Sequence, residues 1–109
     1  MPEFENPASF WDAKYADDDY LFGREPNAFL KREAGRLKPG WRTLMVADGE
    51  GRNGVWLAER GLQVVSVDVS PRAVAKARAL ARTRGVAPEI HNADVDSFDM
   101  GEVAFDAVV

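Results

Sequence analysis

The sequence contains no cysteine and only one histidine, which removes several kinds of chemistry. Without cysteine the chain forms no disulfide, no thiolate nucleophile and no cysteine-ligated zinc site, and we expect no metal site. No apolar run approaches the roughly 20 residues that a membrane-spanning helix needs. The amino terminus is acidic and lacks the charged-then-apolar pattern of a signal peptide. These absences favour a cytoplasmic protein.

An excess of basic charge is also lacking. The chain has 14 lysines and arginines against 18 aspartates and glutamates, a formal net charge of −4. Surfaces that bind nucleic acid are strongly basic because they neutralise phosphates. Arginines do gather between residues 72 and 84, but at helical spacing, and we interpret them as a solvated helix face. The composition therefore predicts a partner other than nucleic acid.

The residues that are present divide the 109-residue domain into two parts. Residues 1–40 have helical patterning and hold seven of the 11 aromatic side chains. Residues 41–109 alternate apolar runs of strand length with helical periodicity, which predicts parallel strands joined by right-handed crossovers. We expect helices through residues 11–15, 26–37, 55–60 and 73–84, and strands at 43–47, 63–67, 87–91 and 104–109.

The fold class that follows is α/β. We predict a Rossmann-like, doubly wound parallel sheet of about four strands with helices on both faces, preceded by a helical entry or lid segment. In an open sheet of this kind ligands bind at the carboxyl ends of the strands. Candidate functional residues are therefore sought at those ends.

A glycine-rich turn connects the first predicted strand to its helix. Its sequence is GEGRNG, residues 49–54. Glycine is needed where a ligand must approach the backbone or where φ is positive, and the following helix aims free N–H groups at the turn. A tight turn without a ligand would carry the same pattern. Its place between a strand and a helix favours nucleotide binding.

Two acidic residues follow later strands at the same predicted edge of the sheet. Asp68 ends the second strand, where a carboxylate can accept from both hydroxyls of a ribose; capping the helix that begins near Ser70 is the alternative. Asp94 follows the third strand and can accept from an adenine amine, with the N–H of Val95 donated to a ring nitrogen. Val69 would pack on the adenine face. An ordinary loop-capping role is the alternative for Asp94.

These motifs together resemble class I S-adenosylmethionine-dependent methyltransferases. Motif I of that family is similar to residues 44–61, LMVADGEGRNGVWLAERG, in the Gly-Glu-Gly-Arg-Asn form of tellurite-resistance and thiopurine-type enzymes. The second strand and its helix are similar to residues 65–77, VSVDVSPRAVAKA, and the adenine motif to residues 93–94. Residues 105–109 resemble the fourth strand and residues 10–27 the entry segment, so the resemblance covers nearly the whole chain.

The resemblance implies S-adenosylmethionine as cofactor and assigns contacts to it. Aromatic faces near the sulfonium would attract its positive charge. The implied contacts are Tyr20 and Phe22 in a lid by the sulfonium, Ala47, Gly49 and Gly51 under the methionine moiety, Asp68 on the ribose, Val69 on the adenine face, and Asp94 with Val95 at the adenine edge.

The sequence departs from the family in two respects. The family usually carries an acid at the position of Met45 and a glycine at Ala47, whereas here the acid is Asp48. We expect Asp48 or a backbone carbonyl to replace the missing contact to the amino group of the methionine moiety. The family also continues through three more strands. We therefore expect an incomplete acceptor pocket, and either a fragment of a longer protein or a homodimer paired through the exposed fourth strand.

The implied function is methyl transfer to a small-molecule acceptor. Transfer from a sulfonium is an in-line displacement that needs mainly alignment, so no catalytic residue is assigned, and His91 is interpreted as structural. Two alternatives remain. The glycines at 49, 51 and 54 with Asp68 also match an NAD-dependent oxidoreductase. A cofactor-binding module without catalysis would carry the same site, and turnover of an acceptor discriminates it from an enzyme.

Overall fold

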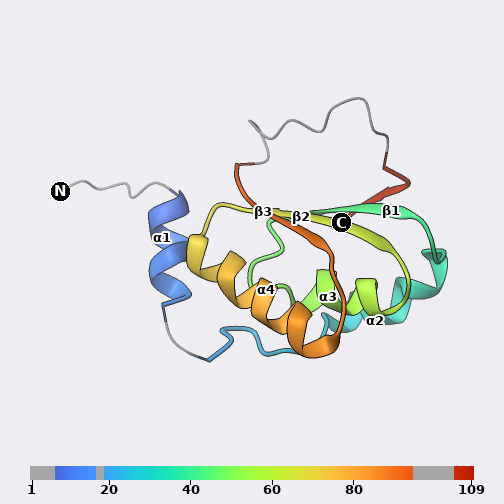
Figure 1. Cartoon of the computed structure of the whole chain (residues 1–109), viewed down its shortest axis with the longest axis horizontal. Helices are drawn as coiled ribbons and strands as arrows, with labels where there is room; N and C mark the ends of the chain where they lie inside the picture. Colours follow the sequence, from blue (N-terminus) through green and yellow to red (C-terminus); the bar gives the residue numbers. More distant parts are fainter. Residues whose placement is uncertain (1–6, 17–18, 95–104) are drawn as a thin grey trace.

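The computed structural model describes residues 7–16, 19–94 and 105–109. Strands and helices alternate as predicted after an amino-terminal helical segment (Figure 1). The elements are α1 (Pro7–Lys14), α2 (Ala28–Glu33), the 3₁₀ helix η1 (Ala34–Arg36), β1 (Arg42–Val46), α3 (Arg52–Glu59), β2 (Gln63–Asp68), α4 (Pro71–Arg84), β3 (Glu89–Asn92) and β4 (Ala107–Val108).

The strands form one parallel sheet in the order β3-β2-β1-β4. Thr43 of β1 lies beside Val64 of β2 on one side and beside Ala107 of β4 on the other. The predicted Rossmann-like α/β fold is confirmed. The fourth strand is shorter than predicted, and it forms one edge of the described sheet. Its predicted pairing with a second chain stays a prediction.

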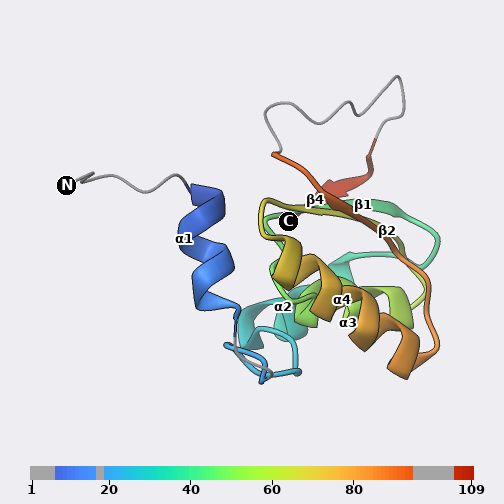
Figure 2. The ribbon, with the colours of Figure 1, turned by 60° about the vertical axis from the view of Figure 1, so that its left-hand side comes forward.

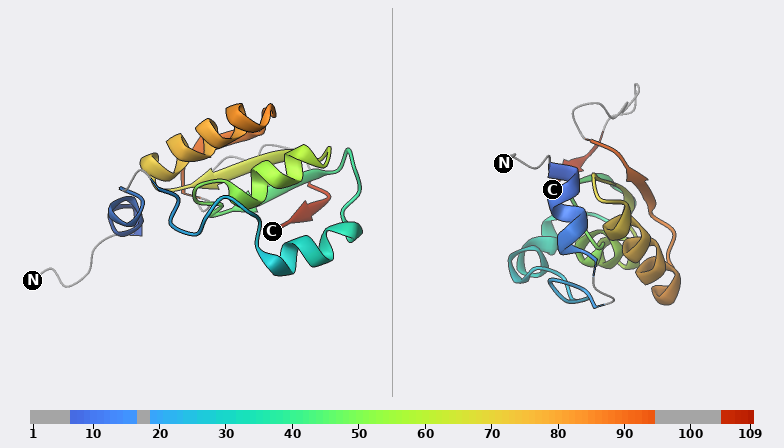
Figure 3. Two further views of the ribbon diagram at one scale, coloured as in Figure 1. Left: turned by 90° about the horizontal axis from the view of Figure 1, so that it is seen from below. Right: turned by 90° about the vertical axis from the view of Figure 1, so that its left-hand side faces the viewer.

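The three helices α2, α3 and α4 lie side by side on one face of the sheet (Figures 1 and 3). These three helices cover one face in the described residues, and the predicted helices on the second face stay a prediction. The shared face of α3 and α4 follows from the direction of winding. The chain steps from β1 to β2 to β3 in one direction across the sheet, and crossovers of one hand then place both connecting helices on the same face.

The longest helix, α4, forms where its local signals predict. The Ser70 hydroxyl accepts a hydrogen bond from the N–H of Ala73 at 3.1 Å, Pro71 occupies the first turn, and Gly85 ends the helix at φ 72°. Its buried stripe follows the 3.6-residue period: Ala73, Val74, Ala77, Leu80 and Ala81. No helix in the described ranges is long and apolar enough to cross a membrane.

The amino-terminal segment packs at two places. Helix α1 stands at the carboxyl end of the sheet (Figure 2), where Asp12 accepts hydrogen bonds from the Ser70 hydroxyl at 2.8 Å and the Arg72 N–H at 2.9 Å. Helix α2 is capped by Asn27, one residue after the predicted Pro26 start, and it buries Leu30 in a core cluster with Met45. The segment therefore runs from the ligand edge of the sheet to its helical face.

Candidate functional site

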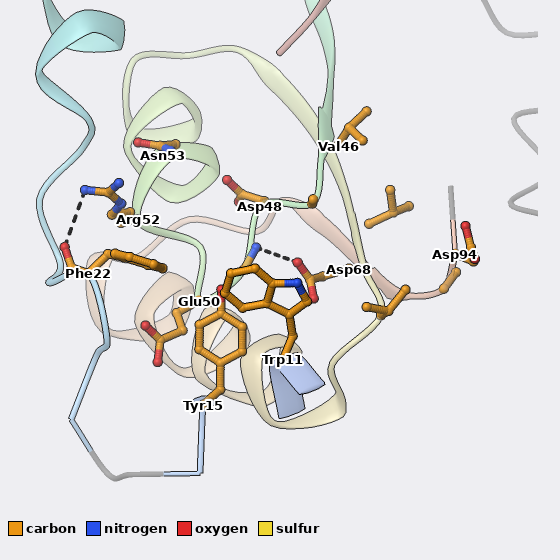
Figure 4. A pocket seen from close by; sticks show the side chains of 15 residues that line it. Trp11, Tyr15, Phe22, Val46, Asp48, Glu50, Arg52, Asn53, Asp68 and Asp94 are labelled. Carbon is orange, nitrogen blue, oxygen red and sulfur yellow. Dashed lines mark hydrogen bonds between the residues drawn. The ribbon is translucent and has the colours of Figure 1, made fainter. Parts of the chain in front are cut away.

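A cavity of about 400 Å³ lies at the carboxyl ends of β1, β2 and β3 (Figure 4). The amino-terminal segment closes one side of it. The lining residues are Trp11, Tyr15, Phe22, Val46, Ala47, Asp48, Gly49, Glu50, Arg52, Asn53, Val67, Asp68, Val69, Ala93 and Asp94. This is the edge at which the sequence predicted a ligand site, and the cavity is of a size that holds small molecules in proteins.

The turn after β1 has left-handed backbone at three positions. Ala47, Gly49 and Gly51 have φ values of 55°, 62° and 90°. The family's glycine at the position of Ala47 has a physical reason here, because this backbone conformation strains residues that carry a Cβ. A Cβ on Gly49 would lie 2.7 Å from the Tyr15 hydroxyl, and one on Gly51 would lie 2.7 Å from the Ala77 Cβ. Gly51 therefore serves the close packing of the turn against α4.

Asp68 joins the turn to the start of α4. One carboxylate oxygen accepts from the Gly49 N–H at 2.8 Å, and the other accepts from the Ser70 N–H at 3.0 Å. The helix cap proposed as the alternative role of Asp68 is supplied by Ser70, whose N–H Asp68 holds just before the helix, and the Asp68 side chain also lines the cavity. Each carboxylate oxygen can accept more than one hydrogen bond, so both roles fit one side chain.

Asp48 is the most perturbed acid of the cavity. Both carboxylate oxygens lie 3.2 Å from the Gly54 N–H, and the Ser66 hydroxyl donates to one of them at 3.3 Å. Burial raises the pKa of Asp48 to about 7, with a further contribution from the negative charge of Asp68, while its hydrogen bonds act in the opposite direction. A Cβ on Gly54 would collide with this carboxylate. Gly54 is thus required by Asp48 at the start of α3.

Two aromatic residues of the amino-terminal segment form a wall that the sequence analysis missed. The rings of Trp11 and Tyr15 are stacked, with centroids 5.8 Å apart and planes at 25°. Burial, followed by the charges of Asp68 and Glu50, raises the pKa of Tyr15 to about 12, so its hydroxyl keeps its proton. Their spacing of four residues, which brings side chains together on a helix, was the available signal.

The predicted lid pair divides into two roles. Phe22 lines the cavity, and the guanidinium of Arg52 lies 5.5 Å from the centre of its ring. Tyr20 does not line it. Its hydroxyl donates to the Lys76 carbonyl at 2.9 Å, and its ring packs against the core cluster that contains Val55. The expected place of Tyr20 beside the sulfonium is therefore corrected, since its polar and apolar parts are both engaged away from the cavity.

Most of the residues predicted for the site are brought together. Seven line the cavity: Phe22, Ala47, Asp48, Gly49, Asp68, Val69 and Asp94. Gly51 and Tyr20 do not, and Val95 lies outside the described residues. Glu50, Arg52 and Asn53 were overlooked although they belong to the glycine-rich turn, and Val46, Val67 and Ala93 are direct neighbours of residues that were predicted.

The cavity is acidic, with aromatic walls. Four carboxylic side chains, Asp48, Glu50, Asp68 and Asp94, line it with one cation, Arg52. Such a cavity suits a ligand that carries positive charge and hydroxyl or amino donors. The described residues that line it include no histidine, serine, cysteine or lysine, and they suit the positioning of a reactive ligand. Among residues 7–16, 19–94 and 105–109 no group of acidic or histidine side chains is arranged to hold a metal ion.

Known proteins resemble about two thirds of the chain. Ribosomal RNA small subunit methyltransferase C of Chromohalobacter salexigens is 42% identical over 72 residues, which are 64% of this chain and 20% of that protein. Thiopurine S-methyltransferase of Pseudomonas aeruginosa is 37% identical over 70 residues, which are 62% of this chain and 32% of that protein. The chain thus matches about a fifth and a third of these relatives.

A solved structure shares the fold. It is the tRNA (uracil-54, C5)-methyltransferase of Pyrococcus abyssi in complex with S-adenosyl-L-homocysteine, with a TM-score of 0.63 and 29% identity over 73% of this chain and 20% of that one. Residues 44–109, from β1 to β4, match the profile of a family described as a methyltransferase domain. This match favours a methyltransferase over the NAD-dependent oxidoreductase that the glycine spacing and Asp68 also allowed. The chain belongs to the methyltransferase domain family.

Proposed function

We propose that the chain forms the cofactor site of an enzyme that methylates a small-molecule acceptor. The cofactor is S-adenosylmethionine, and S-adenosylhomocysteine is its product. The observation that carries the proposal is the cavity itself, where the turn after β1, Asp68 after β2 and Asp94 after β3 meet at one edge of the sheet. Phe22 and Asp94 stand on opposite sides of it (Figure 4).

The charge of the cavity fits this cofactor. S-adenosylmethionine carries a sulfonium, an ammonium and one carboxylate, and the lining offers four acids and one arginine. Asp68 would hold the ribose hydroxyls, while Val69 and Asp94 would hold the adenine. The faces of Trp11, Tyr15 and Phe22 would border the sulfonium. A permanent cation bound there benefits from both the acids and the rings.

Asp48 takes over the contact that Met45 cannot make. Met45 is 2% exposed and belongs to the core cluster with Leu30 and Leu57. Asp48 lines the cavity three positions later, at the start of the glycine-rich turn. We assign it as the acceptor for the ammonium of the methionine moiety. An ammonium beside this carboxylate would stabilise its ionised form.

S-adenosylmethionine supplies an already activated methyl group, so this chain's residues align it and keep water away. The acidic net charge of −4 and the likeness to the thiopurine enzyme support a small-molecule acceptor. The likeness to the ribosomal RNA enzyme supports a second candidate, an RNA acceptor. Methyl transfer to a panel of small thiols and to ribosomal RNA discriminates the two. Transfer to neither would favour the module without catalysis.

Calorimetric titration of the purified protein with S-adenosylhomocysteine, and with NAD in parallel, tests the cofactor site. We expect saturable binding of S-adenosylhomocysteine alone. Asp68→Ala and Asp94→Ala should each weaken it by about tenfold or more, because each removes a hydrogen bond from a charged acceptor. Glu89→Gln, which alters an exposed acid of β3 outside the cavity, is the matched control. Equal affinities for all variants would contradict the assignment.

A further inference from the structure

A buried ion pair connects the glycine-rich turn to α4. The Glu50 carboxylate lies 2.8 Å from the Lys76 ammonium, and the two side chains are 3% and 16% exposed. The Glu50 residue follows Gly49 in the turn, whereas Lys76 lies in the middle of α4. The pair therefore connects a turn that lines the cavity to α4, which packs against that turn.

Both partners also bind the front segment, residues 19–22. The second carboxylate oxygen of Glu50 accepts from the Leu21 N–H at 2.6 Å. The Lys76 ammonium donates to the Asp19 carbonyl at 2.6 Å, and the Tyr20 hydroxyl donates to the Lys76 carbonyl at 2.9 Å. Three consecutive residues of the front segment are thus hydrogen-bonded to the ion pair or to the backbone of Lys76.

The next residue of the front segment reaches the cavity. Phe22 lines it with a side chain that is 55% exposed, and Arg52 both lies over its ring and donates to its carbonyl at 3.4 Å. Figure 4 shows Phe22 with Arg52 and Glu50 on the side of the cavity opposite Asp94. Because Phe22 directly follows residues 19–21, a displacement of those residues would move Phe22 out of its position in the cavity lining.

The ion pair has a consequence that an apolar pair would lack. Removing two charges from water costs about as much as their attraction returns, so a buried pair adds little net stability over well-packed apolar side chains. An apolar pair would also pack the turn against α4. It would offer no acceptor to the Leu21 N–H and no donor to the Asp19 carbonyl. Placement of the front segment is what depends on the charged groups.

We propose that Glu50 and Lys76 are positioning residues that hold the front segment so that Phe22 forms the wall beside the methionine part of the cofactor. The inference rests on the proposed function. The pair would then contribute to the affinity for the amino-acid part of the ligand. Affinity for the adenosine part would depend on the opposite side of the cavity. The test compares two ligands that differ in the amino-acid part alone.

The variants are Glu50→Gln and Lys76→Met, each alone and combined, because the combination leaves neither charge unpaired. Arg78→Gln is the matched control: Arg78 is on the same helix, and its guanidinium donates to the Ile90 carbonyl, away from the front segment. Affinity is measured by calorimetry for S-adenosylhomocysteine and for 5′-methylthioadenosine, which lacks the amino-acid part. Hydrogen–deuterium exchange of residues 19–23 is measured without ligand.

We expect faster exchange of residues 19–23 in all three pair variants. Their affinity for S-adenosylhomocysteine should fall several-fold, by no more than the loss in Phe22→Ala, because the pair acts on the ligand through the placement of Phe22, while that for methylthioadenosine stays within about twofold. Unchanged exchange, or equal loss for both ligands, would overturn the inference. If the unaltered protein binds no S-adenosylhomocysteine, the proposed function fails, and the exchange data still decide whether the pair holds the segment.

Discussion

The raised pKa of Asp48 predicts that folding stability depends on pH in an unusual direction. In the folded protein the pKa is about 7, and its ordinary value is 3.8. Between these values the folded state binds a proton that the unfolded chain has released. The contribution of Asp48 to stability therefore has its full value below pH 3.8 and is lost as pH rises from 3.8 to about 7. The difference of about 3 between the two pKa values, at about 1.4 kcal/mol for each, corresponds to about 4 kcal/mol.

The isosteric variant Asp48→Asn isolates this contribution. Its amide oxygen can still accept from the Gly54 N–H, and its amide nitrogen can donate to the Ser66 hydroxyl, so it resembles the protonated acid. In urea unfolding, we expect the free energy of unfolding of the variant, relative to that of the unaltered protein, to increase by up to about 4 kcal/mol between pH 4 and pH 7.5. Parallel stability curves across that range would refute the burial of an acid at this position.

The same group links cofactor binding to pH. If the ammonium of S-adenosylhomocysteine pairs with ionised Asp48, binding below pH 7 must release its proton. The affinity of the unaltered protein then falls by up to about tenfold for each pH unit below 7. In Asp48→Asn the affinity is lower and independent of pH over this range. Calorimetry in buffers of different ionisation enthalpy measures the released proton directly, and its absence would contradict the assignment of the ammonium site.

Two further predictions concern the turn and the front segment. Gly51→Ala should destabilise the protein by about 3 kcal/mol in urea unfolding, through left-handed strain and collision with Ala77, whereas Gly85→Ala, with φ 72° and open space around it, should cost about 1 kcal/mol. Equal costs would show that the contact with α4 is unimportant. Phe22→Ala should reduce the affinity for S-adenosylhomocysteine several-fold, because Phe22 lines the cavity and Tyr20 does not. Tyr20→Phe should reduce it by less than about twofold, because the bonds from the Leu21 N–H to Glu50 and from Lys76 to the Asp19 carbonyl remain. A larger loss from Tyr20→Phe than from Phe22→Ala would reinstate Tyr20 in the lid.

The elements that local rules govern were predictable. The start and end of α4 depend on Ser70, Pro71 and Gly85, all adjacent to the helix, and the alternation of strands and helices follows from periodicity alone. The carboxyl-end location of Asp68 and Asp94 then follows from a parallel sheet. The placement of helices on one face was not predictable from these signals, because it depends on the order of strands in the sheet.

Side-chain partners that are distant in sequence account for most of the missed site. Tyr20 and Phe22 are two residues apart and chemically alike, yet tertiary contacts with Lys76 and the Val55 cluster hold Tyr20 away from the cavity. Glu50 was overlooked for a related reason. An acid in a glycine-rich turn is normally solvated, and its burial here depends on Lys76, which comes from another element.

The three glycines of the turn show why a fingerprint motif is informative even when its usual explanation is incomplete. A Cβ on Gly49 would meet Tyr15, one on Gly51 would meet Ala77, and one on Gly54 would meet the Asp48 carboxylate. The space that each glycine leaves free is therefore occupied by another residue of the protein. Tyr15 and Asp48 both line the cavity, so the close approach that Gly49 and Gly54 permit forms two of its walls, whereas Gly51 permits the packing of the turn against α4. The glycine spacing predicts a ligand site here because it permits the surrounding walls, and the acids in those walls then determine which ligand the site accepts.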